Sequence, residues 1–478
     1  MHLRRSGIPP EIATVGCVTL ILALFWFDRN HTARTSTALW LPTVWFFLAC
    51  SRTVGQWLHV GPPESIDQYL EGNPFDRAVY TAMIAVGIVV LLHRGNRVAM
   101  ILRTNWPILG FFLYGAVSFF WSDYPGVAFK RWIKALGDLV MVLIVLSDGE
   151  PVAAIRRLLA RLAYTAIPLS ILFIKYYPAL GTMYSPFGGR VVYMGVTVNK
   201  NSLGAICVCF GLASLWRFII AYQDRTRPRR MSTLAVHGAV LAMVLWLLSI
   251  THSMTASFSL LMAGTLLILT NLRGVIQRPA IVPALGAVML VISVAVLFLG
   301  LSPGTLEAIG KDPTLTDRTE LWTLLLGLVR NPLIGTGFDS FWLGPRLQKI
   351  WSVYWWTPNE AHNGYIEVFL NLGWIGIAFL GAVLVHGYRS VLAGWRRNAQ
   401  LGSLCIAYFM VGLVFNFTEA AFFKMGAPVW IFFLLAITGV RKISQQSSLR
   451  SGQSSRVYER PSYDQSHSPI AEGSCEAF

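Results

Sequence analysis

Long runs of apolar residues, separated by short polar segments, recur from one end of the chain to the other. Many of them approach the roughly 20 residues that a helix needs to cross the hydrocarbon core of a bilayer. The pattern predicts an all-α, polytopic integral membrane bundle of about 12–13 transmembrane helices. The predicted spans are 12–27, 38–50, 79–93, 107–121, 129–147, 159–175, 203–221, 234–250, 254–271, 280–301, 365–387, 402–418 and 426–440. Either 38–50 or the 402–440 region is weak enough to be half-inserted or continuous, which would leave twelve.

Basic residues between the apolar runs predict which loops share a side of the membrane. They cluster at Arg94, Arg97 and Arg103; Arg156, Arg157 and Arg161; 225–230; Arg273 and Arg278; Arg389, Arg396 and Arg397; and Arg441 and Lys442. Cytoplasmic loops carry such an excess of Lys and Arg. The segments 121–126, 176–202, 251–257, 302–364 and 418–424 are then expected outside. Thirteen spans would put the N-terminus outside, whereas Arg4 and Arg5 favour the inside.

Composition supports a membrane protein and argues against a nucleic-acid-binding protein and a disulfide-rich or zinc-binding protein. Only 13% of the 478 residues are charged and 55% are hydrophobic, whereas a soluble protein carries roughly 25% charged residues. The net charge of +16 is explained by the basic loops, so we expect no nucleic-acid partner. The six cysteines show no metal-ligand spacing and predict neither a disulfide framework nor a zinc site.

The chain divides into a membrane domain over 1–442 and a tail over 443–478. The tail is rich in Ser, Gln and Pro and is expected to be disordered and cytoplasmic. The outside loop 302–364 is long enough to suggest a function. Within it, 316–333 has apolar residues at helical spacing and ends at Asn331-Pro332, which predicts a short helix on or near the membrane surface.

Polar residues at the mouth of the span 365–387 suggest a site. In "PNEAHNGYIEVFLNLGWIGIAFL" (358–380) we expect Asn359 to cap a helix. Glu360, Asn363, Glu367 and Asn371 would then form one polar ridge, with His362 beside its outer end. Ionisable groups inside a span usually face the bundle interior or a water-filled cavity. The ridge is therefore expected to line a cavity open to the outside, or to hold neighbouring helices by hydrogen bonds.

Three cations and a histidine are predicted on the same outside face, which suggests a di-anionic substrate. Arg190, Lys200 and Asn201 precede the span 203–221, and Arg318 lies on the predicted loop helix. Arginine binds phosphate oxygens in a bidentate manner and lysine acts as a point charge. Arg190 alone would be interpreted as a loop or snorkelling residue. His252, in "THSMTAS", is a further candidate substrate contact, although a helix-end histidine is the commoner interpretation.

Four of these motifs resemble the O-antigen ligase and exopolysaccharide (O-antigen) polymerase superfamily of bacterial inner-membrane glycosyltransferases. They are "WSDYP" (121–125), "GVTVNKNSLG" (195–204), "DRTELW" with "NPLIGTGFDSF" (317–341), and "EAHNGYIEVFLNLGWIGIAFL" (360–380). Together they span roughly 105–440, in the family's order. "VNKNSLG" followed by "THSMTA" is closest to the exopolysaccharide production polymerase branch.

The resemblance implies a substrate and roles for individual residues. The substrate would be an oligosaccharide on undecaprenyl diphosphate, presented on the periplasmic face of the inner membrane by a metal-independent, cofactor-free enzyme. Arg190 and Arg318 match the family's diphosphate-binding arginines, with Lys200 beside them, and His362 matches its essential histidine. The family also suggests a flippase and a chain-length regulator as partners. Many members have an arginine near the position where this chain has His252 and Ser253, so the resemblance does not fix the number of cationic contacts to the carrier.

The chemistry and the alternatives follow from these residues. His362, with an unperturbed pKa near 6.5, could accept the proton of an attacking hydroxyl, while Glu360 or Glu367 orients its ring. We expect a polymerase of lipid-linked repeat units. A ligase that transfers the glycan to lipid A core is the first alternative, and a transporter of the lipid-linked sugar is the second. A transporter would place substrate groups at mid-membrane, whereas these charges gather in outside loops.

Overall fold

The computed structural model describes residues 7–29, 34–59, 72–185, 189–226, 228–295, 314–424 and 426–439. The predicted tail 443–478, Arg4 and Arg5, and the first part of the loop 302–364 lie outside the described residues.

Helices make up almost all of the regular structure in the described ranges, so the predicted all-α class is confirmed. The longer helices are α1 Pro10–Phe27, α2 Trp40–Cys50, α5 Pro74–His93, α7 Trp106–Val117, α8 Pro125–Leu146, α9 Pro151–Tyr176, α11 Lys200–Gln223, α12 Arg230–Thr251, α13 Met254–Thr270, α15 Ile281–Val294, α19 Gly364–Arg397, α20 Ala399–Phe415 and a last helix, Pro428–Gly439. The shorter ones are η1 Thr37–Leu39, α3 Val54–Trp57, α6 Gly95–Thr104, η2 Ser118–Trp121, α10 Pro178–Gly181, α14 Arg273–Ile276, α17 Thr314–Gly327 and α18 Gly344–Val353. Strand β1 Thr182–Tyr184 pairs antiparallel with β2 Val191–Tyr193, with Met183 opposite Val192.

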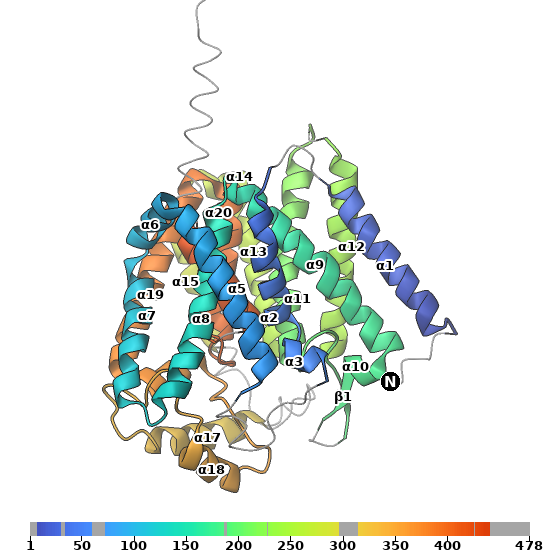
Figure 1. The fold of residues 1–478 in the computed structure, drawn as a ribbon. Helices are drawn as coiled ribbons and strands as arrows, with labels where there is room; N and C mark the ends of the chain where they lie inside the picture. The colour runs from blue at the N-terminus through green and yellow to red at the C-terminus, as the bar shows by residue number, and fades with distance from the viewer. Residues whose placement is uncertain are drawn as a thin grey trace, which may run out of the picture.

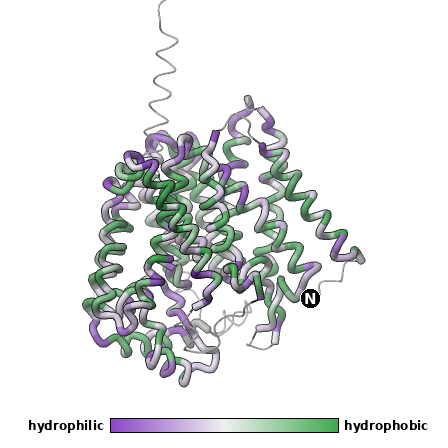
Figure 2. Tube along the Cα trace, viewed as in Figure 1, coloured by the Kyte–Doolittle hydropathy of each residue, from purple (hydrophilic) through white to green (hydrophobic). Residues whose placement is uncertain are grey.

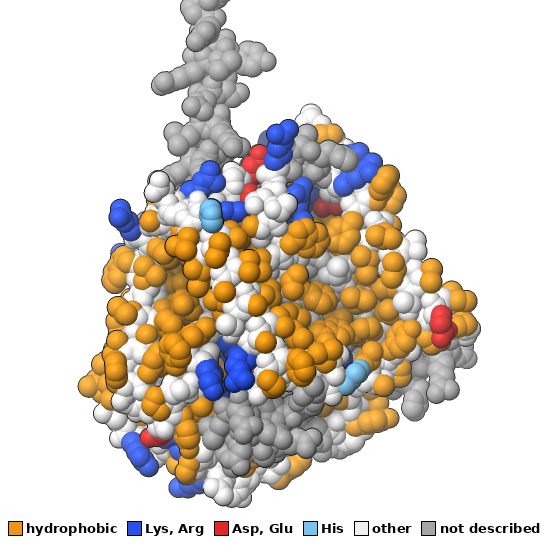
Figure 3. Space-filling model, viewed as in Figure 1, with side chains coloured by type: hydrophobic (Ala, Val, Ile, Leu, Met, Phe, Trp, Pro, Cys, Tyr) orange, Lys and Arg blue, Asp and Glu red, His pale blue; other side chains and the backbone are white. Residues whose placement is uncertain are grey.

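The protein is a multi-pass membrane protein. Six of its described helices are long and apolar enough to cross a bilayer, and six further apolar helices are shorter. The 22-residue α8 corresponds to another predicted span but carries four charged residues, Lys130, Arg131, Lys134 and Asp138. Hydrophobic side chains form a broad band across the bundle, with polar segments above and below it (Figures 2 and 3).

The two ends of the bundle differ in what they carry (Figure 1). We call the end that bears α3, α10, β1, α17 and α18 the site end, and the end that bears α6 and α14 the opposite end. The basic residues of α6 and α14 therefore lie at one end, as their predicted common side requires. The N-terminal end of α1 lies at the site end, in agreement with the thirteen-span prediction.

The short second helix is packed inside the bundle. Trp45 and Phe46 are fully buried, and Trp45 Nε1 donates a 2.7 Å hydrogen bond to Asp138 Oδ1 of α8. This contact holds the 11-residue α2 against α8.

Candidate functional site

The helix predicted from Asn359 begins later, and this corrects the expected polar ridge. Asn363 is the N-cap of α19: its Oδ1 accepts from the backbone N–H groups of Tyr365 (3.0 Å) and Ile366 (3.1 Å). His362 just before it has a φ of 48°, in the left-handed region, which ends any continuous helix there. Glu360 and Asn363 therefore belong to the turn before α19 and not to one ridge with Glu367 and Asn371.

Glu367 and Asn371 hold neighbouring backbone in place. The Oε2 atom of Glu367 accepts from the backbone N–H of Ala361 at 2.9 Å, and its Oε1 accepts from Trp342 Nε1 at 2.7 Å. Asn371 Oδ1 accepts from the backbone N–H groups of Ser340 (2.9 Å) and Phe341 (3.0 Å). These contacts favour the structural interpretation for the two side chains, because Glu367 fixes the turn that carries His362 and both side chains fix the segment 340–342.

A break in α19 accommodates the loop around residues 332–337. Gly373 has a φ of 63° and a ψ of −162°, so the helix is interrupted there. Across the break, Trp374 N donates to Pro332 O at 2.9 Å and Gly337 N donates to Asn371 O at 2.8 Å. The loop therefore satisfies backbone groups that the break would leave unpaired inside the bundle.

Charged side chains converge on His362 at the site end. His362 Nδ1 lies 3.1 Å from Glu360 Oε1 and 3.5 Å from Glu419 Oε2. Lys424 Nζ contacts Glu360 Oε2, and Arg318 lies 4.0 Å from Glu419 Oε1. We call these five residues the His362 cluster. The His362 side chain is 22% exposed, so the ring is partly accessible from outside the bundle.

Segments far apart in the sequence assemble this cluster. Arg318 comes from α17 and donates to the backbone oxygen of Thr418 at 3.0 Å. Asn201, on the first turn of α11, donates to Glu419 Oε1 at 2.8 Å. Asn363 donates to Phe417 O at 3.2 Å. The segment between α20 and the last helix is thus held against α11, α17 and α19.

The cluster stabilises the charged forms of three of its members, His362, Glu360 and Lys424. Burial alone would lower the pKa of His362, but Glu360 and Glu419 outweigh it and raise that pKa to about 9. Burial would raise the pKa of Glu360, yet Lys424 and His362 hold it well below its usual range. Burial likewise opposes the charge of Lys424, and Glu360 raises its pKa above the usual value. At neutral pH the ring of His362 is therefore an imidazolium.

Comparison with known proteins shows which family this chain is similar to. Residues 238–381 match the family described as O-antigen ligase. The matched stretch runs from within α12 into α19 and includes Arg318, Glu360 and His362. Asn201, Glu419 and Lys424 lie outside the matched residues. The predicted resemblance to the O-antigen ligase and exopolysaccharide polymerase superfamily is confirmed.

A curated relative also matches. The chain is 26% identical over 305 residues to the exopolysaccharide production protein ExoQ of Rhizobium meliloti (strain 1021). The match covers 59% of this chain and 64% of that relative, so it spans somewhat less than two thirds of the relative's length.

The structure brings some of the predicted site residues together and not others. Arg318, Asn201, Glu360 and His362 meet around Glu419. Arg190 is exposed just before β2, Lys200 is half-buried at the first position of α11, and His252 is exposed at the C-cap of α12. Among the described residues, these three side chains take no part in the hydrogen bonds and ion pairs of the His362 cluster.

Sequence reasoning missed Glu419 and Lys424. Both lie in "TEAAFFK" (418–424), a short segment between the last two predicted spans that was expected outside the membrane without a functional role. The usable signal was a carboxylate and an ammonium in an otherwise apolar turn on the same predicted side as His362. Nothing in the spacing linked this turn to a histidine more than 50 residues earlier.

A metal ion is a poorer fit to the cluster than charge pairing. Donor atoms of Glu360, His362 and Glu419 lie within 4.8 Å of one another and could in principle hold a cation. However, Lys424 and Arg318 already lie against the two carboxylates and balance their charge. The donor set is therefore better explained as a network of ion pairs.

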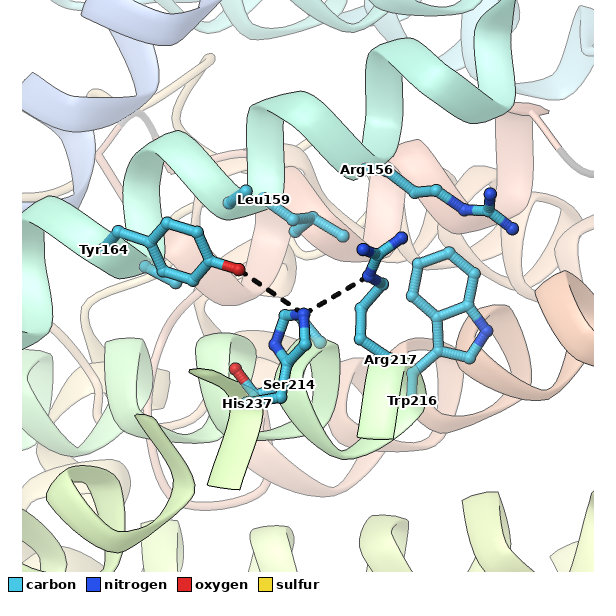
Figure 4. Close-up of a pocket in the computed structure, with 10 residues that line it drawn as sticks. Arg156, Leu159, Tyr164, Ser214, Trp216, Arg217 and His237 are labelled. Atoms are coloured by element: carbon cyan, nitrogen blue, oxygen red, sulfur yellow. Dashed lines mark hydrogen bonds between the residues drawn. The ribbon is translucent and has the colours of Figure 1, made fainter. Parts of the chain in front are cut away.

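A second polar pocket lies at the opposite end, between α9, α11 and α12 (Figure 4). Arg217 Nε donates to His237 Nε2 at 3.3 Å, and the hydroxyl of Tyr164 lies 3.4 Å from the same nitrogen. Asp28, at the end of α1, accepts from Arg217 at 2.7 Å and from Tyr164 at 2.9 Å. These contacts join α1 to the bundle, so we interpret the pocket as structural.

Proposed function

We propose that this protein is a glycosyltransferase that polymerises undecaprenyl-diphosphate-linked oligosaccharide repeat units for an exopolysaccharide. The observation that supports this most strongly is the placement of His362. Its Nδ1 faces two carboxylates, while Arg318 and Lys424 lie in the same cluster. A partly exposed histidine with one nitrogen held against carboxylates is the arrangement that general-base catalysis requires.

The transfer step would use these groups without a metal. The oxygen of an acceptor hydroxyl attacks the anomeric carbon, and its proton passes to Nε2 of neutral His362. The bond between the anomeric carbon and the diphosphate oxygen breaks, and the diphosphate leaves with the bonding electrons. Arg318, supplemented by Arg190 and Lys200, would stabilise the charge on the leaving group by charge-assisted hydrogen bonds.

The two carboxylates would determine both the orientation and the basicity of the base. Glu360 and Glu419 face Nδ1, which leaves Nε2 for the substrate. Because they raise the pKa of His362 to about 9, the resting imidazolium has to lose a proton before it acts. Once neutral, it is a stronger base than an unperturbed histidine.

The membrane context proposed here follows from the charge distribution. The basic loops gather at the opposite end, which we assign to the cytoplasm of a bacterial inner membrane. The site end would then face the periplasm, where lipid-linked units are presented. A flippase that supplies the units and a chain-length regulator are the partners that this reaction would need.

A ligase is the second candidate, favoured by the description of the family that residues 238–381 match. In that reaction the same chemistry would transfer the glycan to lipid A core or another acceptor. The relative is an exopolysaccharide production protein, which favours the polymerase.

Purified protein in nanodiscs would separate the candidates. With an undecaprenyl-diphosphate-linked repeat unit as the only substrate, a polymerase yields a ladder of products of increasing size. Transfer that occurs only after lipid A core is added would support the ligase and overturn the polymerase. If no glycan were transferred to either acceptor and the lipid-linked sugar moved across liposome membranes, the protein would be a transporter. That result would contradict both enzyme proposals.

A further inference from the structure

One face of α8 carries a run of cations that the proposed reaction does not use. Lys130, Arg131 and Lys134 fall within about one and a quarter turns of the helix, and their spacing places them on one face. They lie in the first half of α8, which begins at the site end directly after the "WSDYP" motif.

Arg77 of α5 extends this basic surface. Helices α5 and α8 pack along each other, and Arg77 lies in the first turn of α5, at the same end. Arg77 and Lys130 are exposed, Arg131 keeps 22% of its side chain exposed, and Lys134 is half-buried. Figure 3 shows Lys and Arg side chains gathered at the lower edge of the hydrophobic band, over the lower ends of α5 and α8.

Among the residues that the structure describes, this surface has more positive than negative charge. Two described carboxylates lie beside the four cations: Asp76, which accepts from Gly55 N at 2.8 Å, and Asp339, which lies 3.7 Å from Arg131. Counted over these described side chains alone, four cations against two carboxylates leave an excess of two positive charges. A doubly negative group at the membrane surface would balance that excess.

Asp339 connects the surface to the His362 cluster. Arg131 donates to the backbone oxygen of Asp339 at 2.6 Å, so α8 is joined to the loop that Asn371 and Glu367 hold. Asp339 also acts electrostatically on Lys134 on one side and on Lys424 of the His362 cluster on the other. An anion bound along α8 would therefore lie beside the loop that carries Asp339.

We propose that Arg77, Lys130, Arg131 and Lys134 form a phosphate-binding site that receives the diphosphate of the lipid-linked substrate from the membrane before it reaches His362. This inference rests on the proposed function. Arginine would hold phosphate oxygens in a bidentate manner, and the lysines would add point charges. Its position at the lower edge of the hydrophobic band lets the polyprenyl chain stay in lipid while the diphosphate lies at the interface. A phospholipid headgroup offers the same phosphate chemistry, and the test distinguishes the two.

Binding can be measured without catalysis. Native mass spectrometry would compare retention of undecaprenyl diphosphate, without a glycan, with retention of phosphatidylglycerol. The test variant is R77Q/K130Q/K134Q, which spares Arg131 because of its bond to the loop. The control is R273Q/R278Q, which removes two exposed cations at the opposite end. We expect the test variant to retain undecaprenyl diphosphate about tenfold less than wild type or weaker still. Its retention of phosphatidylglycerol, and the retention of both lipids by the control variant, should not change. Equal loss of both lipids, or loss of neither, would overturn the proposal.

Kinetics separate this inference from the proposed function. In the transfer assay, the test variant should raise KM for the lipid-linked substrate and leave kcat nearly unchanged. His362→Ala should bind undecaprenyl diphosphate normally and lose transfer. If His362→Ala transferred the glycan at the wild-type rate, the proposed mechanism would be contradicted but the binding-site proposal would not. If the test variant lowered kcat with KM unchanged, the binding-site proposal would be contradicted but the mechanism would not.

Discussion

At the scale of single residues, the protonation state of His362 makes the first prediction. A general base must be neutral, and its pKa of about 9 leaves only a small neutral fraction at pH 7. We expect kcat/KM to rise with pH and to level off near pH 9, because kcat/KM reports the free enzyme. A profile that instead falls above pH 9 would mean that His362 acts as an acid or a fixed cation.

Glu419 is predicted to position and charge the histidine. Glu419→Gln removes one of the two carboxylates that face Nδ1, so the pKa of His362 should fall. The rising part of the profile of kcat/KM against pH should then move to lower pH by about one unit. Glu419→Asp should restore part of the shift, and Glu150→Gln at the opposite end serves as the control. If Glu419→Gln lowered the rate without shifting the profile of kcat/KM against pH, Glu419 would have only a structural role.

At the scale of elements, the break in α19 makes a prediction about stability. A Cβ on Gly373 would lie 2.4 Å from the carbonyl carbon of Leu333, at a φ of 63° that other residues rarely adopt. Gly373→Ala should therefore displace the loop and lower the free energy of unfolding by roughly 1–3 kcal/mol. Thermal unfolding in detergent measures this. Gly381→Ala in the same helix meets nothing within 4 Å and should be neutral. Equal Tm values for the two variants would contradict the account.

Comparison of the predicted and observed elements shows which features of the fold the sequence pattern could predict. The apolar runs predicted the spanning helices, and a helix was expected over 316–333 where α17 occupies Thr314–Gly327. The start of α19 was predicted wrongly at Asn359, because hydrogen bonds to distant backbone, such as that from Gly364 N to Asn416 O, decide it. His362, Glu360 and Arg318 could be selected from local polarity. Glu419 could not be joined to them, because that pairing is tertiary and has no local period.

At the scale of the whole molecule, the account predicts which end faces the periplasm. Tyr184 of β1 and Tyr222 of α11 lie at the two ends, with 75% and 65% of their surfaces exposed. In a background with Cys475 replaced by Ser, Tyr184→Cys should react with a membrane-impermeant thiol reagent in cells with a permeabilised outer membrane. Tyr222→Cys should react only after the inner membrane is opened. Reversed labelling would place the His362 cluster in the cytoplasm.

The central claim is that His362 carries the chemistry, and one comparison tests it most directly. Single-turnover transfer from the lipid-linked repeat unit would be measured for wild type, His362→Ala and His93→Ala. The control residue, His93, is exposed at the opposite end. General-base catalysis contributes about 10²–10⁴-fold, so His362→Ala should slow transfer by that factor while substrate binding stays unchanged. His93→Ala should match wild type. Transfer by His362→Ala at the wild-type rate would contradict the account.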